Sequence, residues 1–177
     1  MNLATYPAPA AWIPLDCSDI ADARPSVATT PPAPCEGGPR IVVAVSPDGA
    51  TAAVAAWDRP IRLYRRADGR RLRTFSGKSA RSLALAFAPD GRTLASAGAD
   101  GRVRIWDPAR EVERRELSGH SGPALAVAFS PDGALLASAG VDGLVRLWEP
   151  DTGRLVRTFD GDALTITSDP DGKDLAL

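Results

Sequence analysis

The sequence of residues 128–149 is AFSPDGALLASAGVDGLVRLWE, and its pattern determines the fold that we predict. A Pro-Asp-Gly turn at 131–133 ends one apolar run, 125–129, and an Asp-Gly turn at 142–143 ends a second, 135–139. Aspartate and glycine both tolerate the positive φ that two-residue hairpin turns require. Short apolar runs bounded by such turns therefore predict strands that pair as antiparallel hairpins.

The same pattern recurs with a period of about 42 residues, which is the signature of a repeat architecture. Residues 76–117 and 118–159 align without a gap and are identical at 22 of 42 positions. A Pro-Asp-Gly turn, an aromatic residue and an aspartate six positions before that aromatic all recur in step. The turns begin at Pro47, Pro89, Pro131 and Pro170, the aromatics are Tyr64, Trp106 and Trp148, and the aspartates are Asp58, Asp100 and Asp142.

Each repeat predicts four short strands. The run 102–106 alternates polar and apolar residues, which indicates a half-buried strand whose polar side chains face solvent, and more charged strands follow at 114–117 and 155–159. No window has convincing helical periodicity. Four antiparallel strands in about 42 residues form one propeller blade, so we predict an all-β, incomplete β-propeller of about three four-stranded antiparallel blades plus a partial fourth. The predicted blades are residues 40–76, 77–118 and 119–160, with the partial blade at 161–177.

Residues 1–39 have a different composition, because they hold eight of the sixteen prolines. Proline removes backbone donors and fixes φ, so we expect an extended or disordered Pro-rich leader. Cys17 and Cys35 both lie here, with no neighbouring histidine and without a metal-ligand spacing. Two plain thiols and a disulfide both remain open.

Composition excludes several classes of function. The net charge is −1, and no stretch approaches the about 20 apolar residues of a membrane helix, so we expect neither nucleic acid nor membrane as the main partner. Six arginines fall between 62 and 73, but Arg62 alternates with Ile61 and Leu63, which indicates the exposed side of a strand. A single histidine and two cysteines predict no cofactor, no metal site and no enzyme. With no basic residue before Arg24, we expect a cytoplasmic protein.

The repeats resemble the WD-repeat β-propeller family over about residues 38–177, through Trp106-Asp107, Trp148-Glu149, Ser118-Gly119-His120 and the stretch quoted above. This resemblance implies a hydrogen-bonded tetrad of His, Ser or Thr, Asp and Trp in each blade. The third repeat has all four residues of the tetrad: His120, Ser138, Asp142 and Trp148. The second repeat has Ser96, Asp100 and Trp106 but Lys78 at the position of the histidine. The first repeat is degenerate and has Glu36, Val54, Asp58 and Tyr64 at the four positions. Because imidazole can donate from one nitrogen and accept at the other, we interpret His120 as a structural bridge rather than a general base.

The resemblance implies a non-enzymatic protein-interaction scaffold that binds its partners through the blade-top loops. The candidate partner contacts, taken by position, are Trp57, Lys78, Arg81, Ala99, Ser121, Pro123 and Val141. Trp57 is either an exposed contact or a residue packed under the leader, and both readings remain open. The alternative function is a truncated regulatory or sensor portion of a larger signalling protein, such as a bacterial kinase.

Residues 40–177 hold only a little more than three periods, whereas propellers close with about four to eight blades. We therefore expect apolar faces or unpaired strand edges at both ends of the array. We predict first that the chain is a piece of a longer propeller, second that it self-associates into a closed ring, and third that a partner chain completes it.

Overall fold

The computed structural model describes residues 41–56, 59–75, 81–161, 167–168 and 175–176, all within the compact unit Pro39–Leu177. The predicted leader, with Cys17 and Cys35, lies outside the described residues.

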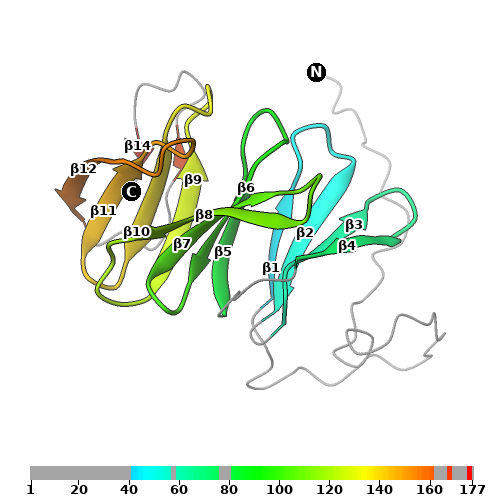
Figure 1. The fold of residues 1–177 in the computed structure, drawn as a ribbon, viewed down its shortest axis with the longest axis horizontal. Helices are drawn as coiled ribbons and strands as arrows, with labels where there is room; N and C mark the ends of the chain where they lie inside the picture. The colour runs from blue at the N-terminus through cyan, green and yellow to red at the C-terminus, as the bar shows by residue number, and fades with distance from the viewer. Residues whose placement is uncertain (1–40, 57–58, 76–80, 162–166, 169–174, 177) are drawn as a thin grey trace, which may run out of the picture. The chain divides into compact units, whose positions relative to one another are not determined.

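The described chain forms three four-stranded antiparallel sheets and no helix, which confirms the all-β prediction (Figure 1). The first sheet contains β1 (Ile41–Val45), β2 (Thr51–Ala56), β3 (Arg62–Arg65) and β4 (Arg71–Thr74). The second contains β5 (Ser82–Phe87), β6 (Leu94–Gly98), β7 (Arg102–Asp107) and β8 (Val112–Ser118). The third contains β9 (Ala124–Phe129), β10 (Leu136–Gly140), β11 (Leu144–Trp148) and β12 (Leu155–Asp160). This arrangement is that of an incomplete β-propeller.

Neighbouring strands in each sheet are consecutive in the chain, so each sheet is a meander whose turns alternate between its two ends. The Pro-Asp-Gly turns join first and second strands, and they share one end with the turns that join third and fourth strands. We call this the Pro-Asp-Gly end. The turns between second and third strands lie at the opposite end, together with the links between sheets, and we call it the connection end. Gly49, Gly91 and Gly133 have φ between 67° and 73°, as the turn chemistry predicts.

The core lies between successive sheets. Between the first and second sheets, Phe75 and Trp106 are both fully buried, and their ring centroids lie 5.2 Å apart at an interplanar angle of 58°. Ile105, Phe129 and Trp148 belong to the cluster between the second and third sheets. Such tilted aromatic contacts and continuous apolar burial make each sheet depend on its neighbour for stability.

The alternation predicted for 102–106 is wrong in one respect. Arg104 is 3% exposed, and in β7 only Arg102 faces solvent. Arg62, predicted on an exposed face, is half-buried. A charged residue can occupy a buried position when a carboxylate neutralises it, and Arg104 has such a partner in Asp100.

The first sheet carries an apolar surface on β1. Ile41, Val43 and Val45 are 36%, 53% and 53% exposed, whereas the corresponding strands β5 and β9 contain no large exposed apolar side chain. All six residues of β12 in the third sheet are also exposed, including Phe159. These are the exposed faces expected of an open array of sheets.

Two further strands, β13 (Thr167–Ser168) and β14 (Leu175–Ala176), pair antiparallel after the third sheet. The Pro-Asp-Gly turn predicted between them, 170–172, lies outside the described residues. Within the described ranges, no helix is long and apolar enough to cross a membrane.

Candidate functional site

Four side chains of the third repeat form one hydrogen-bonded chain near the connection end. Trp148 Nε1 donates to Ser138 Oγ at 2.9 Å, and Ser138 Oγ lies 2.9 Å from His120 Nε2. His120 Nδ1 lies 2.9 Å from Asp142 Oδ1. The side chains of His120 and Asp142 are only 1% and 6% exposed, so water cannot replace these bonds without opening the blade.

Both ring nitrogens of His120 have hydrogen-bond partners. Ser138 Oγ already accepts from Trp148, so its own hydroxyl proton is free to be donated to Nε2. Nδ1 faces two groups, the Asp142 carboxylate at 2.9 Å, which accepts from a protonated Nδ1, and Arg146 Nη1 at 2.7 Å, which donates to an unprotonated one. His120 thus connects the indole, through Ser138, to the carboxylate, and its side chain is closed to solvent.

Arg146 completes the surroundings of Asp142. Its Nη1 donates to Asp142 Oδ2 at 2.8 Å and also lies within hydrogen-bond distance of His120 Nδ1, at 2.7 Å. Burial raises the pKa of Asp142, but the hydrogen bonds from His120 and Arg146 outweigh it and hold that pKa far below its ordinary value. A Cβ on Gly140 would lie 2.4 Å from His120 Nδ1, so only glycine allows the ring to approach this closely.

The second sheet holds the equivalent turn with arginine instead of histidine. Trp106 Nε1 donates to Ser96 Oγ at 2.9 Å, as in the third sheet. Arg104 donates two hydrogen bonds to the Asp100 carboxylate, at 3.2 and 2.6 Å, and also forms an ion pair with Glu116 at 3.2 Å. Burial raises the pKa of Asp100, but the hydrogen bond from Arg104 and its positive charge give a net lowering. The Asp100 side chain is 28% exposed, so this brace is the wetter of the two.

The brace of the third sheet also fixes the loops at its connection end. Ser121 N donates to Asp142 Oδ2 at 3.2 Å, and Val141 N donates to Pro123 O at 2.9 Å. The link into the third sheet and the turn between β10 and β11 are therefore bonded to each other. The side chain of Val141 projects from this fixed backbone and is 56% exposed.

The structure places five of the seven predicted partner contacts, and Trp57 and Lys78 lie outside the described residues. Ser121, Pro123 and Val141 come together as described above. In the second sheet Ala99 N donates to Arg81 O at 3.0 Å, so the remaining two are neighbours as well. Arg81 is exposed and has a φ of 35°, a conformation that a non-glycine residue adopts only at a cost and that is concentrated at functional positions.

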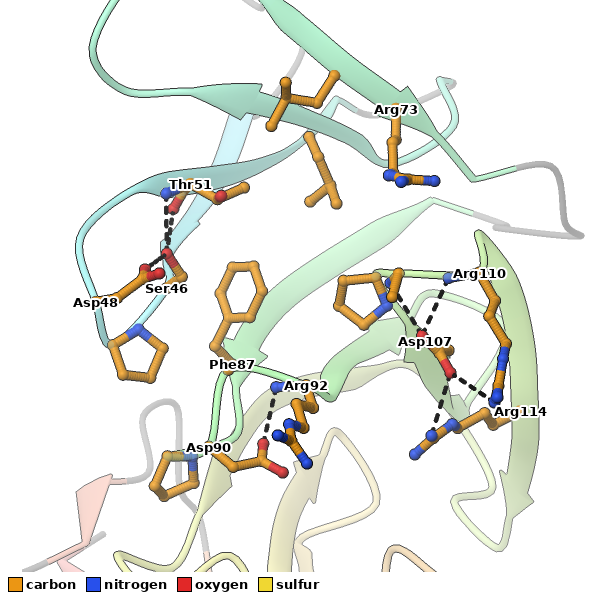
Figure 2. Close-up of a pocket in the computed structure, with 17 residues that line it drawn as sticks. Ser46, Asp48, Thr51, Arg73, Phe87, Asp90, Arg92, Asp107, Arg110 and Arg114 are labelled. Carbon is orange, nitrogen blue, oxygen red and sulfur yellow. Dashed lines mark hydrogen bonds and ion pairs between the residues drawn. The ribbon is translucent and has the colours of Figure 1, made fainter.

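Sequence reasoning missed a cavity of about 650 Å³ at the Pro-Asp-Gly end, between the first and second sheets (Figure 2). Four arginines line it: Arg73 from the first sheet and Arg92, Arg110 and Arg114 from the second. A signal for it exists in the sequence, because the third repeat carries Ala134, Thr152 and Val156 at the positions aligned with the last three. Among the described residues, no group of His, Cys, Asp or Glu is arranged to hold a metal ion.

The comparisons agree with this architecture. A family model described as "WD domain, G-beta repeat" matches residues 69–107 and 111–149. Each matched segment begins with or just before the outer strand of one sheet and ends at the third strand of the next. The sequence repeat thus spans two neighbouring sheets and ties them covalently. No curated protein matches the chain.

Proposed function

The chain belongs to the WD-repeat family, and from that premise we propose that it is a non-enzymatic scaffold that binds a protein partner through the loops at the connection end. WD repeats form a protein-interaction kind of domain, and proteins built from them are generally not enzymes. The proposed contacts are Arg81, Ala99, Ser121, Pro123 and Val141.

The observation that carries the proposal is the exposed Val141 side chain on a turn whose backbone is held from two sides. Asp142 is fixed by His120 and Arg146, and Val141 N is fixed by Pro123 O. A surface loop that is already ordered loses little conformational entropy when a partner binds. Apolar side chains presented in this way are therefore effective contacts for another protein.

The non-enzymatic part of the proposal rests on the burial of the titratable groups. The side chains of the single histidine and of the aspartate beside it are 1% and 6% exposed, and four nitrogen atoms lie within hydrogen-bond distance of that carboxylate. A general base must reach the proton of its substrate, and this His-Asp pair is closed to solvent.

Affinity capture with matched variants tests the binding surface. Wild type, Val141→Asp and Val112→Asp are immobilised and exposed to a lysate of the source cells, and the retained proteins are quantified by mass spectrometry. Val112 is 47% exposed on the outer strand β8, so its variant makes the same chemical change far from the proposed surface. Circular dichroism melting verifies that both variants remain folded.

We expect at least one protein to be retained by wild type and Val112→Asp but lost with Val141→Asp. Equal retention by all three, or no specific retention, would overturn the proposal.

A further inference from the structure

We propose that the cavity at the Pro-Asp-Gly end, which we call the arginine cleft, binds an acidic peptide segment that also carries an apolar side chain. It lies at the opposite end of the sheets from the loops discussed above, so it is a second interaction site. Its volume of about 650 Å³ falls within the range of about 300–1,000 Å³ that is usual for ligand pockets.

The cleft has an apolar part. Leu63 is buried beneath it, while Phe87 is half-buried and Leu72 is 39% exposed. Leu72 lies on the outer strand β4 and leaves part of its apolar surface in water. An apolar side chain of a ligand would remove this surface from water.

The cleft also offers positive charge. Arg110 and Arg114 both pair with Asp107, and Arg73 pairs with Glu111 at 2.6 Å. In the part of the chain that the structure describes, no side chain pairs with the Arg92 guanidinium, although its backbone N–H donates to Asp90. Arg92 is therefore the cation most available to a ligand carboxylate.

Two of the three carboxylates that line the cleft accept several hydrogen bonds, whereas Asp90 accepts only from Arg92 N among the described residues. Asp48 accepts from the Ser46 hydroxyl at 2.5 Å and from Ala50 N at 2.9 Å, and these hydrogen bonds lower its pKa. Asp107 is 6% exposed and accepts from two backbone N–H groups in addition to its two arginines. The lining holds four arginines against three aspartates, and it is the arginines that retain unused donors.

Three of the four cleft arginines are replaced in the third repeat, whereas Arg73 aligns with Arg115 and Arg157 and is common to all three repeats. The second and third repeats agree at 22 of 42 positions, yet Arg92, Arg110 and Arg114 correspond to Ala134, Thr152 and Val156. The first repeat also has alanine, Ala50, at the position of Arg92. The turn itself therefore does not require the Arg92 side chain.

Backbone strain occurs at the same rim. Glu111 has a φ of 63°, and the aligned residues of the other two repeats are glycines with φ of 66° and 77°, Gly69 and Gly153. A glutamate at this position costs conformational energy, and its carboxylate holds Arg73 over the cleft. The strain thus coincides with the positioning of a cleft arginine.

A peptide fits this cleft better than a nucleic acid. The three aspartates would repel a continuous phosphate backbone, and the lining holds one half-buried aromatic residue, Phe87, rather than a row of exposed aromatics on which successive bases could stack. A peptide can place a single carboxylate against Arg92 and an apolar side chain against Leu72 and Phe87. A peptide segment with one acidic and one apolar side chain supplies both of these contacts.

Selection from a displayed library of random 12-residue peptides tests the proposal on the full chain. Recovered peptides are labelled and titrated by fluorescence anisotropy against wild type, Arg92→Ala and Leu72→Ser. Arg157→Ala and Leu155→Ser on β12 of the third sheet are the matched controls, because both residues are exposed there. Arg92→Ala introduces the residue that both other repeats carry, so the turn is expected to form normally.

We expect recovered peptides to combine Asp or Glu with a nearby apolar residue, and Arg92→Ala to weaken them about tenfold, as the loss of one charge-assisted hydrogen bond implies. The controls should change affinity less than twofold. A peptide with its acid replaced by the amide should bind wild type and Arg92→Ala equally. Recovery of no Arg92-dependent peptide, recovery of acid-free peptides only, or stronger Arg92-dependent binding of a 12-nucleotide DNA would overturn the proposal.

Discussion

The second and third sheets are near copies in sequence but hold their connection-end turns by different chemistry. The third places His120 between Ser138 and Asp142, and its aspartate side chain is 6% exposed. The second uses Arg104 to hold Asp100, which is 28% exposed. Both sheets keep the Trp-to-Ser bond and an arginine four residues after the aspartate. Histidine therefore adds burial to a brace that arginine and tryptophan can form without it.

The largest difference in stability between the two braces is expected when the aspartate of each is removed. Asp142→Ala would leave Arg146 nearly buried without its carboxylate, which costs about 3 kcal/mol. Asp100→Ala should cost only about 1 kcal/mol, because the buried Arg104 keeps Glu116 as a carboxylate partner. Urea unfolding of both variants measures the two free energies. Equal losses would show that the histidine brace is no tighter than the arginine brace.

Removing the serine hydroxyls gives the next largest difference. Ser138→Ala leaves both the Trp148 indole N–H and His120 Nε2 without a partner, so we expect a loss of about 2 kcal/mol. Ser96→Ala should lose about 1 kcal/mol, since among the described residues Ser96 bonds only the Trp106 indole. Thermal unfolding of the two variants provides the test. A larger loss for Ser96→Ala would contradict the assigned bonding.

Acid should weaken the third sheet through Asp142. Its pKa is lowered in the folded state, so its contribution to stability is complete above the unfolded pKa of about 3.9 and is lost progressively as the pH falls below that value. Urea midpoints at pH 6, 4 and 3 measure this dependence. We expect Asp142→Asn to flatten the fall between pH 4 and 3 more than Asp100→Asn does. The same slope in Asp142→Asn and wild type would show that Asp142 is not the group that titrates.

The strand pattern could be read from the sequence because turn chemistry marks every boundary. The apolar run 125–129 and the charged strand 155–159 each match an observed strand to within one residue. The hydrogen-bonded tetrad followed from the resemblance, and the distances at His120 and Ser138 agree with it. The repeats made these predictions possible, because a strand or turn expected in one repeat recurs at the aligned position of the next.

Two features could not be read in the same way. A period of two assigns Arg104 to the solvent face, because the pattern does not reveal that Asp100, four residues earlier, neutralises it. The arginine cleft combines turns from two sheets, so no single window of sequence contains it. Differences between repeats, such as Arg92 against Ala134, are the signal that points to the cleft.

The smallest expected effect concerns the turn between the third and fourth strands. Glu111→Gly removes the strain of a positive φ but also an exposed ion pair with Arg73, so we expect a net gain of about 0.5 kcal/mol. Gly153→Ala at the equivalent turn of the third sheet should instead lose about 1 kcal/mol. Differential scanning calorimetry can resolve the opposite signs. A loss of stability in Glu111→Gly would mean that the ion pair outweighs the strain.

Hydrogen–deuterium exchange of the chain with a captured partner tests the central claim, that the loops fixed by the His120 brace bind another protein. We predict that partner binding slows exchange in peptides that contain Ser121 and Val141, while peptides from the outer strand β8 remain unchanged. Slower exchange confined to other parts of the chain, with no change at Ser121 and Val141, would contradict the account.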